Sequence, residues 1–179
     1  MRNVGLETLR AAIPPYARDL LINLDSVLAT DLLDEQQLWG AVLASAMTTR
    51  SVPVIRAVAA EASDRLKPEA IEAAKAVASR MALHNVYFRA KHLIGDEAYQ
   101  GLPARLRRQV SSTPGVGAAD VEAWSVAVSA ITGCGVCLES HERSLRGAGV
   151  SREVVDEVLR AAAVVHALAV TLDAEAASY

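Results

Sequence analysis

The segment from Glu122 to His141 gathers the residue types that carry out thiol redox chemistry. Cys134 and Cys137 form a C-x-x-C motif, and they are the only cysteines among the 179 residues. His141 follows Cys137 by four residues, so on a helix its imidazole lies one turn further along the same face. Glu122 stands twelve residues before Cys134, and the next charge along the chain is Glu139. The spacing therefore points to a thiol, a base and an isolated carboxylate that can meet.

A helix break just before the cysteines favours an activated thiol. Gly133 interrupts the helical pattern, so both cysteines fall in the first turn of a new helix. Free backbone N–H groups and the helix dipole favour an anionic thiolate there. If the preceding helix folds back on the new one, Glu122 can hydrogen-bond one ring nitrogen of His141 while the other faces Cys137. We interpret this set as an orienting group, a base and a nucleophile.

The two cysteines are expected to have different roles. Cys137 and His141 stand at i and i+4, within reach of direct proton transfer, whereas Cys134 is seven residues from the histidine. The helix dipole alone would favour Cys134, but proton transfer needs a partner in contact. We therefore expect Cys137 to be the attacking nucleophile, with Cys134 as the second thiol of the pair.

Other interpretations of the same residues stay open. A C-x-x-C in a helical protein can be two small core residues that coincide in spacing. Zinc is a second alternative, with ligands Cys134, Cys137, His141 and Glu122, although crowding within one helical turn makes tetrahedral geometry awkward. On either reading the chain would be a non-catalytic thiol redox sensor or a zinc-binding adaptor instead of an enzyme.

Composition excludes several classes of protein. The chain has 18 Lys and Arg against 21 Asp and Glu, a net charge of −3, so it lacks the basic field that nucleic-acid or membrane-surface binding requires. Hydrophobic residues make up 52% of the chain, which excludes intrinsic disorder. Met1–Ile13 is interrupted by Glu7 and Arg10, unlike a signal peptide, and no apolar run reaches membrane-span length. We expect a cytoplasmic protein.

Alanine-rich helical patterning predicts an all-α fold: one domain over residues 1–179, with about eight helices and the active-site segment at 120–149. Asp34 and Gln37 form a capping box that opens a helix to about residue 50. Pro68 opens a long helix that Gly95 ends.

The second half of the chain carries similar signals for helix starts and ends. Residues 111–117 read as a loop, and Asp120 is expected to cap a helix over 121–131. A further helix should start near Cys134 and end at Gly147 or Gly149. Ser151 is expected to cap the last helix, to about residue 174.

A faint internal repeat suggests a duplicated helical unit. Trp39 and Trp124 stand 85 residues apart, each followed by apolar residues. At that offset the two cysteines and the histidine of the motif align in sequence with residues that offer no thiol or imidazole, namely Thr49, Val52 and Arg56. If the repeat is real, only its second copy carries chemistry.

Several other residues are candidates for a functional role. His84 and His92 share one helix face and read as structural or interface histidines, with cofactor ligation as the alternative. His166 lies on an apolar helix and reads as a core or interface residue. Trp39 and Trp124 read as core anchors. A short basic cluster reads as a solvated face or as a docking site for an acidic protein; it consists of Arg105, Arg107 and Arg108.

The full spaced pattern (Glu, eleven residues, Cys, two residues, Cys, three residues, His) resembles the signature of the alkylhydroperoxidase D (AhpD) family, within the carboxymuconolactone decarboxylase-like superfamily. The surrounding stretches E-Q-Q-L-W-G, H-N-V-Y-F-R, S-A-I-T-G-C and H-E-R-S-L-R are also similar, so the resemblance spans nearly the whole chain. Some members carry a histidine immediately before the second cysteine. Here Val136 stands there and cannot transfer a proton, which leaves the relay through His141 and Glu122.

The resemblance implies an AhpD-like antioxidant enzyme that reduces alkyl or lipid hydroperoxides and regenerates a partner peroxiredoxin, AhpC. In that chemistry Cys137 would attack the peroxide and become a sulfenic acid, and Cys134 would act as the resolving thiol and proton donor, so that an intramolecular Cys134–Cys137 disulfide closes. The enzyme's electrons would come from dihydrolipoyl groups on a dihydrolipoamide acyltransferase, with no bound cofactor and no metal. A homotrimer is expected on the same ground. The decarboxylase branch of the superfamily is a rival reading that gives the C-x-x-C no role.

Overall fold

The computed structural model describes residues 5–107 and 114–178, and these contain helices and no strand. The all-α expectation is confirmed. The described residues hold nine α-helices instead of about eight, because a four-residue helix, too short to show periodicity, follows Gly95. The helices are α1 (Leu6–Ala12), α2 (Asp19–Leu28), α3 (Glu35–Thr49), α4 (Val52–Arg65), α5 (Pro68–Ile94), α6 (Glu97–Gln100), α7 (Ala118–Thr132), α8 (Gly135–Gly147) and α9 (Arg152–Ala177), with a 3-10 turn at Pro15–Ala17.

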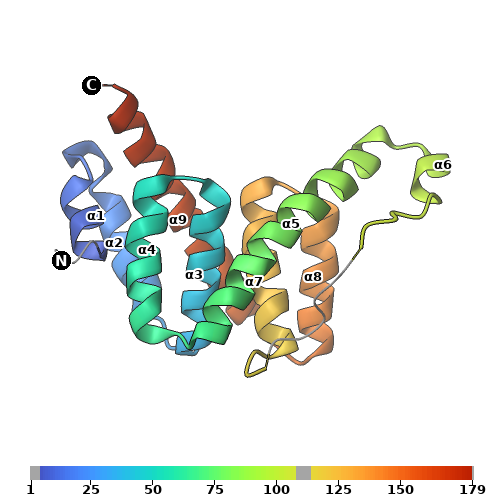
Figure 1. The fold of residues 1–179 in the computed structure, drawn as a ribbon, viewed down its shortest axis with the longest axis horizontal. Helices are drawn as coiled ribbons and strands as arrows, with labels where there is room; N and C mark the ends of the chain where they lie inside the picture. The colour runs from blue at the N-terminus through green and yellow to red at the C-terminus, as the bar shows by residue number, and fades with distance from the viewer. Residues whose placement is uncertain (1–4, 108–113, 179) are drawn as a thin grey trace.

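Two helical hairpins form the centre of the molecule. α3 with α4 makes one hairpin and α7 with α8 the other, and α3 packs directly against α7 (Figure 1). The long helix α5 crosses in front of both hairpins and packs on α3, α7 and α8, while α9 packs on α3 and α7 from behind. α6 lies at the outer end of α5, away from the hairpins. No helix of the described residues is long and apolar enough to cross a membrane.

Local signals set several helix ends. The Asp34 carboxylate accepts from the Gln37 backbone N–H at 2.8 Å, and the Gln37 side chain accepts from the Asp34 N–H at 3.2 Å, which is the expected capping box. Pro68 occupies the first turn of α5, and Gly95 ends it with a φ of 71°. The Ser151 hydroxyl caps α9. These four boundaries follow from sequence alone.

One predicted cap is wrong. α7 begins at Ala118 with Gly117 as its N-cap, so Asp120 is the third helical residue and not the cap. Its carboxylate accepts from the Gly117 N–H at 3.1 Å and from the Gln36 side-chain amide at 2.8 Å. An aspartate can satisfy free N–H groups from either position, so its presence does not by itself fix the start of the helix.

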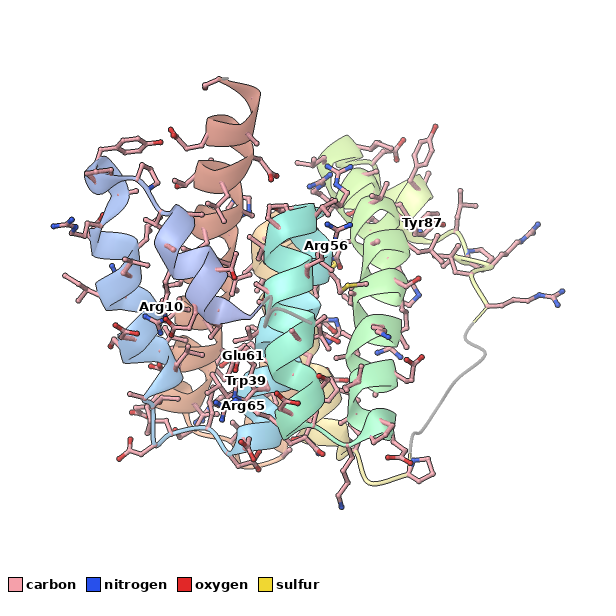
Figure 2. The ribbon with its side chains drawn as sticks, turned by 60° about the vertical axis from the view of Figure 1, so that its left-hand side comes forward. Arg10, Trp39, Arg56, Glu61, Arg65 and Tyr87 are labelled. Carbon is pink, nitrogen blue, oxygen red and sulfur yellow. A yellow bond between two sulfur atoms is a disulfide. The ribbon has the colours of Figure 1, made fainter. Side chains whose placement is uncertain are left out.

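The two tryptophans are buried core anchors, as expected. The Trp124 indole N–H donates to the Gln37 carbonyl oxygen at 3.1 Å, which ties α7 to the start of α3. Arg65 of α4 stacks over the Trp39 ring at 4.9 Å and lies near Glu61, as Figure 2 shows. His166 is exposed on α9, so the core alternative for it is wrong and the interface alternative stays a prediction.

Helix lengths and positions reveal the internal repeat. α3 and α4 have 15 and 14 residues, and α7 and α8 have 15 and 13. The long helices that follow, α5 and α9, have 27 and 26. α3 starts at residue 35 and α7 at 118, and α4 starts at 52 and α8 at 135, so both separations are 83 residues. The offset of 85 was therefore wrong by two residues, although the repeated hairpin is real.

The corrected register aligns two sharp corners. Arg50 ends α3 with φ 64° and ψ 5°, and Gly133 ends α7 with φ 67° and ψ 32°, so both corners use a left-handed residue. The first copy places apolar or small residues where the second copy has its motif. Cys134, Cys137, His141 and Glu122 correspond to Ser51, Val54, Val58 and Trp39, all of them buried.

Candidate active site

The corner between α7 and α8 positions the two cysteines. Gly133 turns the chain in the left-handed conformation that glycine adopts without strain, and Cys134 is the N-cap of α8. Cys137 lies one turn further along, and its backbone N–H donates to the Cys134 carbonyl oxygen at 3.1 Å. The two sulfur atoms are bonded to each other at 2.12 Å. The structure thus describes the oxidised, disulfide form of the pair.

The histidine and the carboxylate of the motif form a hydrogen-bonded pair. His141 Nδ1 lies 2.7 Å from Glu122 Oε2, which joins α8 to α7. An ionised carboxylate only accepts, so Nδ1 carries the proton and Nε2 is left to act as a base. The side chains of His141 and Glu122 are 20% and 29% exposed, so the pair is half-buried.

A cleft of about 490 Å³ opens beside this pair. Cys137, His141 and Glu122 line it, whereas Cys134 is fully buried and is not among the lining residues. The opposite wall is α5, which contributes Arg80, Met81, His84 and Phe88. Ala104 and Leu106, from the segment after α6, close one end. A small molecule entering the cleft therefore meets Cys137 and not Cys134.

Two side chains hold α5 in place over the corner. The Asn85 amide donates to the Thr132 hydroxyl at 2.7 Å, and the Arg89 guanidinium donates to the Thr132 carbonyl oxygen. Thr132 is the last residue of α7, directly before the corner glycine. Because this face of α5 is bound to α7, the neighbouring face, which carries His84, is turned toward α8 and the cleft.

His84 is the cleft residue whose place sequence reasoning missed. It lines the cleft and its ring packs edge-on against Phe88, with centroids 5.7 Å apart. His92, on the same helix, is exposed and does not line this cleft. A clue existed in the spacing of Met81, His84 and Phe88 on one helix face, but nothing local says which neighbour that face meets. Val136 also lines the cleft and contributes only apolar surface.

The remaining candidate groups among the described residues do not line the cleft. Arg105 and Arg107 are exposed, and Arg108 falls outside the described residues. Glu139 is exposed and pairs with Arg143 on the same helix. Within the described ranges, no three His, Cys, Asp or Glu side chains are grouped as metal ligands.

Comparison with known proteins places this geometry in context. Residues 97–178 match the Carboxymuconolactone decarboxylase family. Alkyl hydroperoxide reductase AhpD of Streptomyces coelicolor is 52% identical over 173 residues, which cover 97% of each protein. The protein of the same name from Frankia alni is 51% identical over 93% of this chain and 90% of its own. The one from Rhodospirillum centenum is 47% identical over 97% of this chain and 94% of its own.

Proposed function

The chain belongs to the family of the alkyl hydroperoxide reductases AhpD, and we propose that it reduces alkyl or lipid hydroperoxides at Cys137. One observation carries the proposal: Cys137 lines the cleft together with His141, whose Nδ1 is hydrogen-bonded to Glu122 at 2.7 Å. Among the two cysteines, only the one with a base four residues away faces the cleft. The sensor and adaptor readings do not need such an arrangement.

The peroxide step uses the reduced protein. His141 Nε2 takes the Cys137 proton, and the thiolate attacks the terminal oxygen of the hydroperoxide. An S–O bond forms and the O–O bond breaks, so the sulfur is oxidised to a sulfenic acid and the peroxide is reduced to an alcohol. Glu122 holds the imidazole in the required tautomer and stabilises its protonated form. Cys134 then displaces the sulfenic oxygen as water, and the disulfide closes.

Reduction of the disulfide completes the cycle. A dihydrolipoyl dithiol attacks one sulfur and displaces the other as a thiol, and its second thiol then releases the protein as the free dithiol. The products are a reduced enzyme and a cyclic lipoyl disulfide. We propose that a dihydrolipoamide acyltransferase carries the dihydrolipoyl group. We propose further that the reduced protein regenerates the peroxiredoxin AhpC. We also propose that the protein works in the cytoplasm, where such donors would be available to it.

We also propose a homotrimer. The outer half of α5, with α6 and the residues after it, exposes large apolar side chains: Leu83, Val86, Leu93, Ile94, Tyr99 and Leu102. All of these except Leu93 line an apolar hollow of about 610 Å³, and an apolar surface of this kind is typical of a subunit contact. Sedimentation equilibrium should give three times the 18.9 kDa chain mass. A monomer at micromolar concentration would contradict the proposal.

Consumption of tert-butyl hydroperoxide by the pre-reduced protein tests the function. One equivalent of peroxide should remove two thiols per chain, and zinc analysis of the same sample should find no bound zinc. Dihydrolipoamide should sustain repeated turnover. Cys137→Ser should abolish peroxide consumption. Stoichiometric bound zinc, or thiols that survive the peroxide, would instead favour a metal-binding adaptor.

A further inference from the structure

The leaving oxygen of the peroxide needs its own proton donor. Attack by a thiolate on an O–O bond proceeds in line, so the departing oxygen points away from the Cys137 sulfur. In a cleft between α8 and α5, that direction is toward α5. An alkoxide is a strong base and a poor leaving group, so a proton donor on that wall would accelerate the step.

The α5 wall offers two groups with acidic or polar hydrogens, Arg80 and His84. A guanidinium does not release its proton in a protein, which leaves the imidazole as the group that can. The Phe88 ring packs against it edge-on and restricts its orientation. Asn85, the next residue, is fixed to Thr132 at 2.7 Å, so the backbone that carries His84 is held over the α7–α8 corner.

We propose that His84 is a second catalytic histidine, the general acid that protonates the departing alkoxide; this rests on the proposed peroxidase function. The sulfur of Cys137 donates an electron pair to the terminal oxygen, the O–O bond breaks, and the alkoxide takes the proton of the His84 imidazolium. The proton that His141 removed from Cys137 returns through water to His84. Two thiol hydrogens and one hydroperoxide thus yield a disulfide, an alcohol and water. His141 on the α8 wall therefore acts as the base, and His84 on the α5 wall acts as the acid.

Leaving-group dependence tests this role directly. With tert-butyl hydroperoxide the leaving group is an alkoxide, which needs a proton, whereas with peracetic acid it is acetate, which leaves without one. His84→Gln should lower kcat/KM for tert-butyl hydroperoxide by roughly a hundredfold. The same variant should reduce peracetic acid at close to the wild-type rate. A merely structural histidine would affect both oxidants alike, so an equal loss for the two overturns the proposal.

Two further variants make the test secure. His92→Gln removes an exposed imidazole from the same helix and should leave both rates unchanged. His84→Ala opens space on the α5 wall, and added imidazole should restore its rate with tert-butyl hydroperoxide alone. If imidazole has no effect while circular dichroism shows a native fold, the assignment of His84 is wrong. A wild-type protein inactive toward both oxidants would instead reject the proposed function itself.

Discussion

Gly40 of α3 lies directly under the indole ring of Trp124 of α7. A Cβ atom added to Gly40 would stand 2.1 Å from the Cε2 and Cζ2 atoms of that ring, far inside van der Waals contact. The two central helices therefore approach closely because one of them has no side chain at the crossing. The same approach brings the indole N–H to the Gln37 carbonyl oxygen.

Gly40→Ala should destabilise the protein despite the better helix propensity of alanine. Overpacking a tight core costs roughly 1–3 kcal/mol, and the propensity gain of about 1 kcal/mol offsets only part of it. Urea unfolding followed by circular dichroism measures the change. Gly147→Ala is a matched control, since nothing lies within 4 Å of its added Cβ. An equal effect of the two substitutions would show that the indole moves aside freely.

The two left-handed corners predict substitutions of opposite sign. Arg50→Gly should raise the free energy of unfolding by about 0.5–1 kcal/mol. The strain that the left-handed backbone imposes on arginine is larger than the extra conformational entropy that a glycine loses on folding. Gly133→Ala should lower it by about 1 kcal/mol for the converse reason. Both changes are read from urea midpoints. Shifts in the same direction would contradict the interpretation of the corners.

Glu122→Gln should impair catalysis more than folding. The amide keeps the shape of the side chain but cannot stabilise a protonated His141, and general acid–base catalysis contributes roughly a hundredfold or more. We expect kcat/KM for tert-butyl hydroperoxide to fall by about that factor, with the unfolding midpoint nearly unchanged. Turnover close to wild type would mean that Glu122 serves the structure only.

Single-cysteine variants should separate the two thiols. In Cys134→Ser, peroxide should still convert Cys137 to a sulfenic acid, because this sulfur lines the cleft beside His141. Dimedone should label it, and mass spectrometry should find no intramolecular disulfide. Cys137→Ser should show no fast reaction at all. The reverse labelling pattern would exchange the roles and require His141 to act on Cys134 through water.

Features encoded within a few residues were predictable from sequence. The Asp34–Gln37 capping box, the stop at Gly95 and the new helix after Gly133 each depend on local hydrogen bonds and backbone conformation. The pairing of His141 with Glu122 also followed, because a hairpin of two helices joined at Gly133 leaves few ways to arrange them.

What could not be predicted depends on contacts between distant segments. His84 reaches the cleft because Asn85 and Arg89 bind Thr132, more than 40 residues further along the chain. No periodicity in α5 specifies that partner. The register of the repeat failed for a different reason: alanine-rich helices align almost equally well at several offsets. Only the paired corners at Arg50 and Gly133 determine the separation of 83 residues.

The corner at Gly133 carries the chemistry and the corner at Arg50 does not, although both belong to the same repeated hairpin. Selection for activity therefore acts on the second hairpin, whereas the first is under selection for stability alone. Substitutions in α3 and α4 can be judged only by how well they fill the core, so exchanges among aliphatic residues at Val54 and Val58 should be widely tolerated. In α7 and α8 the equivalent positions, Cys137 and His141, must satisfy both demands. In a saturation mutagenesis screen, harmful variants of the first hairpin should therefore lose cellular abundance. At the second pair of positions, variants of similar size and polarity, such as Cys137→Ser, should lose activity while abundance stays normal.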